Sequence, residues 1–391
     1  MTETIEGPTA VPGDRSTSAL VRIALVLALL FVFLVGVNGL GEGFKSLGRD
    51  LLDSFFRATE NPFMGLMVGI LATTLVQSSS VTTSLIVGLV AAPENALPLA
   101  NAVPMVMGAN IGTTVTNTLV SLAHMGRRQE FYRAFSVATC HDFFNFMAVI
   151  LLLPLELASG YLRKAATAIS GMLGDFGGGV DYDSPLKVAL TSVVGRIDGG
   201  LGAVLPGERS QAVALILLSG VLIYVALMLL VRLMRAAMAS RVETMVGRGL
   251  YRAPLVAMLI GVVATVMVQS SSITTSLLVP LAGAGMITLE QAFPITIGAN
   301  VGTTITALLA AAAVTGPNAR WGVTIAVVHL LFNLSATVLI FPNHRVREIP
   351  LRLARRLAAV AVRSRRLALA YVVGLFYGLP ALFALVNHFL P

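Results

Sequence analysis

Two short polar stretches carry most of the chemistry that this sequence offers, because each one interrupts a long apolar run. The first is Gln-Ser-Ser-Ser at residues 77–80, and the same four residues return at 269–272. Serine hydroxyls can rotate to donate to a tetrahedral oxyanion, and each glutamine amide supplies two more donors. This donor set predicts an anion-binding site. The candidate residues are Gln77, Ser78, Ser79, Ser80, Gln269, Ser270, Ser271 and Ser272.

A second duplicated element follows each polar stretch and offers ligands for a small cation. It reads GANIGTT at residues 108–114 and GANVGTT at residues 298–304. Amide and hydroxyl oxygens are hard ligands, and a bound cation would neutralise an anion at a site without Lys or Arg. The competing interpretation is helix packing, since Gly, Ala and Thr let membrane helices approach closely. The candidate cation ligands are Asn110, Thr113, Thr114, Asn300, Thr303 and Thr304.

A third and weaker match pairs residues 141–145, His-Asp-Phe-Phe-Asn, with residues 329–333, His-Leu-Leu-Phe-Asn. Ionisable residues inside a membrane are functional candidates by default, although a neutral histidine bonded to a backbone carbonyl is the favoured interpretation here. Asp142 corresponds to Leu330, so it is either a lone ion ligand or a helix-end cap, and both remain open. The accessory candidates are His141, Asp142, Asn145, His329 and Asn333.

Three elements that recur in the same order indicate an internal duplication. The composition indicates the class of protein: 56% of the residues are hydrophobic and 12% are charged, about half of the roughly 25% that is usual in soluble domains. Long apolar runs recur, so the sequence predicts an all-α polytopic membrane protein. The single cysteine, Cys140, excludes an intrachain disulfide framework and gives no metal-ligand spacing.

The duplication divides the chain into two repeats with connecting segments. In order, we expect a disordered cytoplasmic tail at 1–18, a first repeat at 19–155, an external loop at 156–209, a second repeat at 210–341, a basic amphipathic cytoplasmic segment at 342–366 and a C-terminal apolar helix at 367–391. The first repeat is expected to hold a span, a hairpin at 62–92, a broken span at 98–123 and a span at 131–155. The second is expected to hold a span, a hairpin at 254–283, a broken span at 292–313 and a span at 321–341.

Each polar stretch lies between two apolar segments of about half the length of a membrane span. A straight helix would place Gln and Ser at the bilayer centre. We therefore expect a re-entrant hairpin, whose irregular tip is in contact with protein or with a water-filled cavity. The Gly-rich second element predicts a broken span. Three crossings separate the hairpins, so the repeats are inverted and their breaks meet at the midplane, where secondary transporters bind substrate. The second half-helix of each hairpin begins at the tip, and its N–H groups and dipole favour an anion.

Arginines mark one side of the membrane. Most of them fall in connections on the side that also holds the N-terminus and residues 342–366, which predicts that this side is the cytoplasm and that 156–209 is external. The expected location is the plasma (inner) membrane, crossed several times, with the side of the C-terminus left open. The net charge of +8 then faces anionic lipid, so nucleic acid is not an expected partner.

Paired QSSS elements, each followed by GAN(I/V)GTT, resemble the type II sodium/phosphate cotransporter family over about residues 20–341. The resemblance implies inward symport of inorganic phosphate driven by sodium, with phosphate at the two QSSS tips and an elevator-like movement of the hairpin domain. It implies sodium as coupling ion and no cofactor. It also implies three partners: inorganic phosphate, sodium ions and the lipid bilayer. By position it adds Thr82, Thr83, Thr274 and Thr275 to the cation candidates.

Two departures from the family and several alternatives remain. Animal members have cysteines in the external loop, which one Cys cannot reproduce, and no cytoplasmic phosphate-regulatory domain of the kind fused to some bacterial relatives is present. The alternatives are a proton-coupled or other small-oxyanion transporter, or a non-transporting phosphate sensor. An enzyme is not expected, because the site lacks an activated nucleophile, a general base and a metal. Stoichiometry, electrogenicity and the existence of a homo-oligomer stay open.

Overall fold

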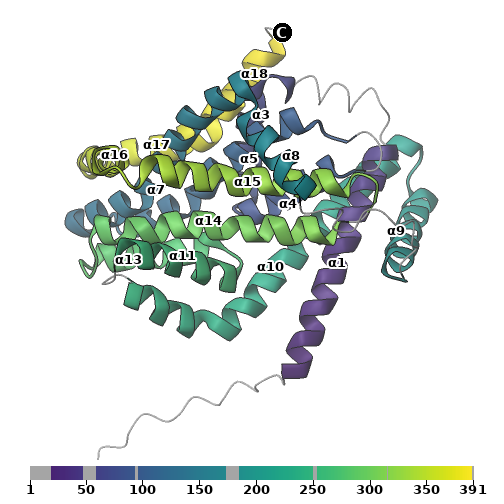
Figure 1. The fold of residues 1–391 in the computed structure, drawn as a ribbon, viewed down its shortest axis with the longest axis horizontal. Coiled ribbons are helices and arrows are strands. Elements are labelled where there is room, and N and C mark those ends of the chain that lie inside the picture. Colours follow the sequence, from purple (N-terminus) through teal and green to yellow (C-terminus); the bar gives the residue numbers. More distant parts are fainter. Residues whose placement is uncertain are drawn as a thin grey trace, which may run out of the picture.

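The computed structural model describes residues 19–46, 59–92, 96–172, 185–249, 253–314 and 316–389, and these residues form helices with no strand among them (Figure 1). The helices are α1 (Ala19–Ser46), α3 (Pro62–Val76), α4 (Ser79–Val90), α5 (Leu99–Thr113), α6 (Val115–Leu122), α7 (Arg128–Ser159), α8 (Tyr161–Met172), α9 (Pro185–Val204), α10 (Glu208–Gly249), α11 (Pro254–Val268), α12 (Ser271–Ser276), α13 (Leu278–Gly283), α14 (Leu289–Ala313), α15 (Ala319–Ile340), α16 (His344–Arg363), α17 (Arg365–Val373), η1 (Gly374–Gly378) and α18 (Leu379–Phe389).

Within those ranges, five helices are long and apolar enough to cross a membrane. They cover Arg128–Ser159, Glu208–Ala226, Leu289–Ala312, Ala319–Ile340 and Arg365–Asn387. The helices on either side of the polar stretches are apolar but shorter. The molecule is therefore an all-helical membrane protein, as the composition predicts. The expected tail at 1–18 lies outside the described residues.

Helices are interrupted at both polar stretches, in the same way in the two halves. Helices α3 and α11 each begin with a proline at the first helical position, where its missing N–H costs no hydrogen bond. Each ends at a glutamine in the left-handed conformation. Helices α4 and α12 start two residues later and are capped by Ser78 and Ser270. In the second half a further interruption at Leu277 separates α12 from α13.

Proline explains why only the second half divides again. Pro280 lies inside α13, where it cannot donate to the carbonyl of Ser276 and its ring crowds that carbonyl. The corresponding position of the first half is Gly88, and α4 continues unbroken from Ser79 to Val90.

The GAN elements are almost entirely helical, which corrects the broken span expected in the second half and leaves a short interruption at Thr114 in the first. Helix α14 runs through GANVGTT without interruption, so the break expected within 292–313 is absent. In the first half, α5 includes Gly108 to Thr113, and the chain departs from regular helix only at Thr114, between α5 and α6. Glycine does not break these helices, because its role here lies in contact with a neighbouring helix.

That contact is between the GAN helices and the helices before the polar stretches. A methyl group at Gly108 would lie 2.1 Å from the carbonyl oxygen of Leu66 on α3. Its counterpart at Gly298 would lie 1.9 Å from the carbonyl oxygen of Met258 on α11. No Cβ fits at such distances, so α3 against α5 and α11 against α14 approach as closely as membrane helices with small residues do. The structure supports the packing interpretation for these glycines.

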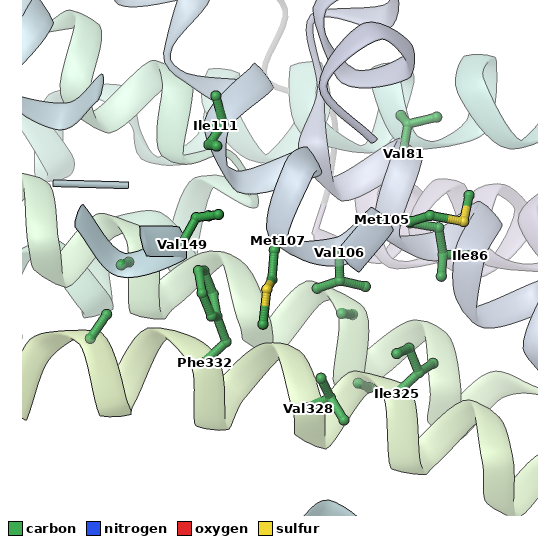
Figure 2. Packing of buried hydrophobic residues seen from close by; sticks show 14 of the residues in the cluster. Val81, Ile86, Met105, Val106, Met107, Ile111, Val149, Ile325, Val328 and Phe332 are labelled. Carbon is green, nitrogen blue, oxygen red and sulfur yellow. The ribbon is translucent and has the colours of Figure 1, made fainter. Parts of the chain in front are cut away.

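Apolar side chains from α4, α5, α7 and α15 form the core around these pairs. Figure 2 shows Val106 and Met107 of α5 near Val328 and Phe332 of α15, with Val149 of α7 beside them. All five are buried. In a bilayer the gain from such contacts is dispersion between well-packed atoms, since lipid tails are equally apolar.

Helices α1 and α10 pack on each other along their length, and their buried side chains join the same core (Figure 1). Three glycines of α1, Gly36, Gly39 and Gly43, face α10 so closely that a methyl group on each would meet Ile223, Ser219 or Ile216 within 2.8 Å. Small residues spaced by three and four positions keep this face of α1 flat against its partner.

Much of the expected external loop is helical. Helix α7 ends at Ser159, and α8 and α9 occupy part of 156–209, where the sequence predicts one amphipathic segment near 161–174 and no helix corresponding to α9. Buried Glu156 accepts from the N–H of Leu162 at 2.6 Å and from Nε of Arg163 at 2.9 Å, which caps the start of α8. The Gly-rich residues 176–184 lie outside the described ranges.

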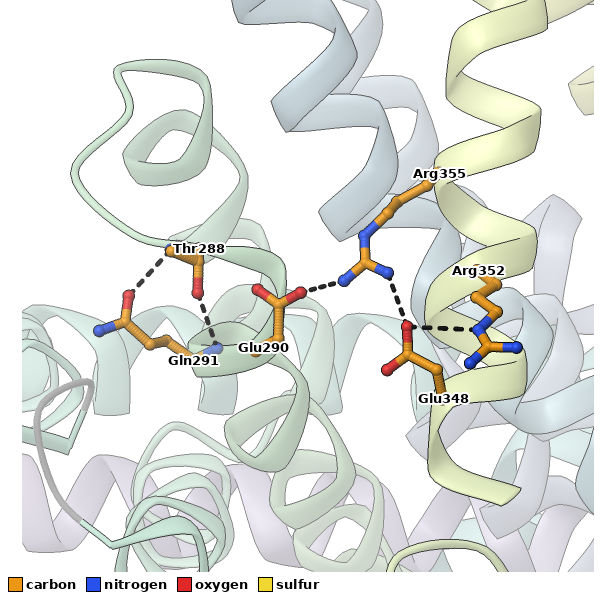
Figure 3. Close-up of polar contacts among 6 residues, drawn as sticks. All are labelled: Thr288, Glu290, Gln291, Glu348, Arg352 and Arg355. Carbon is orange, nitrogen blue, oxygen red and sulfur yellow. Dashed lines mark hydrogen bonds and ion pairs between the residues drawn. The ribbon is translucent and has the colours of Figure 1, made fainter. Parts of the chain in front are cut away.

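Helix α16 is amphipathic and is attached to the core by apolar packing and by ion pairs. Its buried face, which includes Leu351 and Ala354, packs on α7. Beside this face, half-buried Arg355 pairs with Glu348 of the same helix and with Glu290 in the first turn of α14 (Figure 3). The hydrogen bond from Arg355 lowers the pKa of the Glu348 carboxyl below its ordinary value.

Close packing at Gly298 makes the first prediction. We expect Gly298→Ala to lower the midpoint of thermal unfolding in detergent by several degrees, because the added methyl forces α11 and α14 apart at a cost of about 1–3 kcal/mol. The matched control is Gly220→Ala in α10, where no atom lies within 4 Å of the new methyl. Equal midpoints for the two variants would contradict the close contact.

Candidate functional site

Both polar stretches line one cavity of about 210 Å³. The first half contributes Gln77, Ser78 and Ser80, and the second half contributes Gln269 and Ser270. The remaining lining residues are Val76, Val81, Tyr224, Met228 and Thr306. The structure thus brings together residues 192 positions apart in the chain, and among the described residues no charged side chain lines the cavity.

Backbone conformation distinguishes the two glutamines from the other described residues that are not glycine. Gln77 has φ of 54° and Gln269 has φ of 53°, and among the described residues they are the only non-glycine residues with positive φ. A left-handed L-residue costs roughly 1–2 kcal/mol that a glycine avoids. Strain of this kind gathers at functional sites, and its presence in both halves indicates that the amide side chain is needed there.

The serines after each glutamine have different positions. Ser78 and Ser270 are the helix N-caps, and each hydroxyl oxygen accepts from a backbone N–H three residues later, at 3.4 Å. Their hydroxyl hydrogens remain free to donate toward the cavity. Ser80 lines the cavity from the first half, whereas its counterpart Ser272 does not. Ser79 and Ser271 are buried and also lie outside the lining.

Helix termini add partial charges on both sides of the tips. Helix α4 begins beside the cavity, so its first N–H groups and its positive dipole end lie near bound ligand. Helices α3 and α11 end at the same place, and their last carbonyls carry the opposite partial charge. In α11 one of these carbonyls, Val266 O, already accepts from the Gln269 amide at 2.6 Å.

Thr306 is a lining residue that the sequence prediction missed. Its hydroxyl donates to Oε1 of Gln269 at 3.0 Å, which holds the amide in place at the cavity wall. It lies one helical turn after Thr303, a candidate that does not line the cavity. The signal was present, because the match between the halves continues two residues beyond GANIGTT and GANVGTT, to Thr116 and Thr306. Tyr224 and Met228 of α10 were also missed, and no polar pattern in that helix marks them.

The predicted cation ligands do not line the cavity. The eight threonines each donate their hydroxyl to a backbone carbonyl three or four residues earlier, the usual behaviour of threonine in membrane helices. Their oxygens keep lone pairs, so the bonds do not exclude a cation. These threonines are Thr82, Thr83, Thr113, Thr114, Thr274, Thr275, Thr303 and Thr304.

The asparagines of the GAN elements lie in a buried contact between the halves. His141 of α7 bonds through Nε2 to Oδ1 of Asn300 at 3.2 Å, and His329 of α15 bonds through Nε2 to Oδ1 of Asn110 at 3.3 Å. Each histidine therefore contacts the asparagine of the other half. All four residues are at most 1% exposed.

Two further asparagines complete this contact. Asn145 donates to the backbone oxygen of Asn110 at 2.9 Å and accepts from Nδ2 of Asn300 at 2.7 Å. Asn333 donates to the carbonyl of His329 at 3.2 Å and lies at the edge of bonding distance from Oδ1 of Asn110. The accessory candidates His141, Asn145, His329 and Asn333 thus form one network with Asn110 and Asn300.

The histidine partners correct one expectation. Each histidine bonds to a side-chain amide oxygen and not to a backbone carbonyl. Because an amide oxygen can only accept, Nε2 carries the hydrogen. The other ring nitrogen, Nδ1, is buried without a hydrogen-bond partner in both residues. A neutral imidazole meets these conditions, since a second N–H would have no acceptor.

The structure excludes one of the two interpretations of Asp142 that the sequence leaves open. Asp142 lies in the middle of α7, far from either helix end, so it is not a helix-end cap. Its Oδ2 accepts from the hydroxyl of Tyr371 at 2.6 Å.

The fold and the cavity define a class of protein. Two related helical halves in a membrane, whose interrupted helices meet at one shared cavity, form the architecture of a membrane transport protein. The sequence profile of the Na⁺/Pi-cotransporter family matches residues 32–173 and 222–355. The chain belongs to this family of transporters.

Similar proteins carry names that agree with the family. The rat sodium-dependent phosphate transport protein 2A is 33% identical over 431 residues, covering 93% of this chain and 67% of the rat protein. The sheep 2A protein is 32% identical, covering 94% and 68%. The human 2B protein is 30% identical, covering 92% and 64%. No solved structure matches the chain.

The strained glutamines make the second prediction. We expect Gln77→Gly to raise the midpoint of thermal unfolding relative to Gln77→Ala, because glycine adopts the left-handed conformation without the cost of roughly 1–2 kcal/mol that alanine bears. The same order should hold at Gln269. Scanning calorimetry of the four purified variants checks this prediction. Equal midpoints within each pair would mean that the backbone at residues 77 and 269 leaves the left-handed conformation in the variants.

Proposed function

We propose that this protein is a sodium-coupled symporter that carries inorganic phosphate into the cell. The observation that carries the proposal is the cavity shared by the two Gln-Ser tips, with amide and hydroxyl donors and no charged side chain in its lining. The relatives named as sodium-dependent phosphate transport proteins support the same substrate and the same coupling ion.

The cavity suits a small anion. Its volume of about 210 Å³ is below the roughly 300–1,000 Å³ of sites for drug-sized ligands. Gln77, Ser78, Ser80, Gln269 and Ser270 are proposed to donate to phosphate oxygens. Ser79, Ser271 and Ser272 are proposed to act only through the shape of the tips.

An anion in this site needs more neutralisation than the protein itself provides, which is the physical reason for symport. The first N–H groups of α4 supply part of it. Sodium is proposed to supply the rest, bound by the terminal carbonyls of α3 and α11 and by nearby threonine hydroxyls. No resident cofactor is proposed, because cation and phosphate are both cargo.

The membrane arrangement that we propose is a pair of inverted repeats with re-entrant hairpins. Helices of 15 residues (α3) and 12 residues (α4) are about 22 and 18 Å long, too short for a hydrocarbon core of about 30 Å. The reciprocal contacts His141–Asn300 and His329–Asn110 are those that a twofold relation between repeats requires.

We further propose an elevator-like alternating access. Glycine contacts hold α3 against α5 and α11 against α14, and α4 packs on α14, so these helices would carry the cavity as a unit. The pair α1 and α10 would be the scaffold, and Tyr224 and Met228 place α10 at the cavity wall. The protein is placed in the plasma membrane with a cytoplasmic N-terminus and an external 156–209 segment, which the exposed arginines of α16 on the opposite side support.

Reconstituted transport provides the third prediction. Purified protein in proteoliposomes should accumulate radiolabelled phosphate above equilibrium under an inward sodium gradient, and should not do so under a proton gradient alone. We expect Gln77→Ala and Gln269→Ala each to abolish accumulation, since both amides face one cavity. Gln129→Ala, on an exposed turn of α7, is the matched control. Strong uptake by either tip variant would contradict the shared site, and binding without accumulation would indicate a sensor.

The histidine network makes the fourth prediction, which separates sodium from proton coupling. We expect His141→Gln to leave the pH dependence of uptake unchanged, because an amide can also donate to Asn300 Oδ1 in place of Nε2. His141→Leu should instead reduce the yield of folded protein, since it leaves Asn300 partly unsatisfied. A pH profile flattened by His141→Gln would favour proton transfer through this residue.

A further inference from the structure

A buried acidic residue lies outside the cavity and outside the histidine network. Asp142 is 0% exposed in the middle of α7. Its Oδ2 accepts from the Tyr371 hydroxyl at 2.6 Å, and Thr118 of α6 approaches the same oxygen at 3.5 Å. Its other oxygen, Oδ1, is buried and has no hydrogen-bond partner. The Thr114 hydroxyl also lies beside this carboxyl group. Hydroxyl groups therefore gather at Asp142 while Oδ1 has no hydrogen-bond partner.

No cation of the described protein neutralises this carboxyl. Helices α5, α6, α8 and α13–α16 pack on α7, yet none of their described residues forms an ion pair with Asp142. Its sequence neighbours are occupied elsewhere, since Cys140 donates to Val137 O and His141 contacts Asn300. The titratable group that faces it is Tyr371 on α17.

The surroundings are dry. The Tyr371 ring meets Phe135 and Phe376 edge-on, with ring centres 6.3 Å apart in each case. Both phenylalanines are fully buried. A bare carboxylate in such surroundings costs far more than a neutral or neutralised one. A proton or another small cation at Oδ1 would therefore stabilise this carboxyl group.

We propose that Asp142, with Tyr371 and Thr118, is a binding site for one monovalent cation, separate from the cavity between the Gln-Ser tips. The second half has Leu330 at the corresponding position, so the site occurs in one half only and breaks the twofold pattern. Tyr371 lies beyond the region that the family profile matches, which ends at residue 355. The C-terminal helix therefore completes a site that the duplicated core alone does not contain.

The occupant is a proton or a sodium ion, and two measurements distinguish them. Infrared spectroscopy of the purified full chain in lipid nanodiscs detects a protonated carboxylic acid by its carbonyl absorption, with and without sodium. Equilibrium binding of ²²Na⁺ counts sodium sites directly. Both are made on wild type, Asp142→Asn and Tyr371→Phe, with Asp198→Asn on α9 as the control, whose carboxylate accepts from Gln211.

A proton occupant predicts an acid carbonyl band that Asp142→Asn lacks and that Tyr371→Phe shifts in frequency. A sodium occupant predicts that Asp142→Asn binds one fewer sodium ion, and that Tyr371→Phe binds at that site about tenfold more weakly, as expected for the loss of one hydrogen bond to a charged group. Asp198→Asn should match wild type.

Asp142→Asn spectra and sodium counts identical to wild type would overturn the proposal. If that variant does not fold, Tyr371→Phe decides: a band and a sodium affinity unchanged by the loss of its hydroxyl would overturn it as well. Neither measurement uses phosphate, so a failure of the proposed phosphate transport would be recognised separately.

Discussion

The rest of the structure depends on two interrupted helices inside a membrane. A bilayer offers no water to unpaired backbone groups, so an interruption persists only where protein or a polar cavity receives those groups. Here both interruptions occur at a left-handed glutamine followed by a capping serine, and both face the same cavity. The features that satisfy the broken backbone are thus the features that present amides, hydroxyls and helix ends to a ligand.

Close packing holds these tips in place. Glycines such as Gly108 and Gly298 let the GAN helices touch the backbone of the helices that lead into the tips, so a tip cannot shift without its neighbour. The reciprocal histidine–asparagine contacts then join the two halves deep in the molecule. Rigid bodies joined in this way favour movement as units, which is the movement that alternating access requires.

Thr306 and Asp142 show how the halves differ. In the second half Thr306 bonds Gln269, whereas the hydroxyl of its counterpart Thr116 is buried without a partner. Asp142 and the C-terminal Tyr371 have no equivalent pair in the second half, where Leu330 stands. The coupling of two different ions that we propose requires unlike sites, and single replacements of this kind are where the two halves become unlike.

Local chemistry was readable from the sequence alone. The duplication, the membrane class and the interruptions at Gln77 and Gln269 follow from residue types and their spacing. The family is indicated by the resemblance of the paired motifs, and the family profile confirms it. The tertiary structure decided what spacing cannot express. It showed that GANVGTT is continuous helix, that Asn110 and Asn300 contact histidines of the opposite half, and that Tyr371 meets Asp142. The last two outcomes depend on partners more than 150 residues away. The first depends on Met258, 40 residues before Gly298, because the sequence of a glycine is the same whether it ends a helix or allows a neighbouring helix to approach.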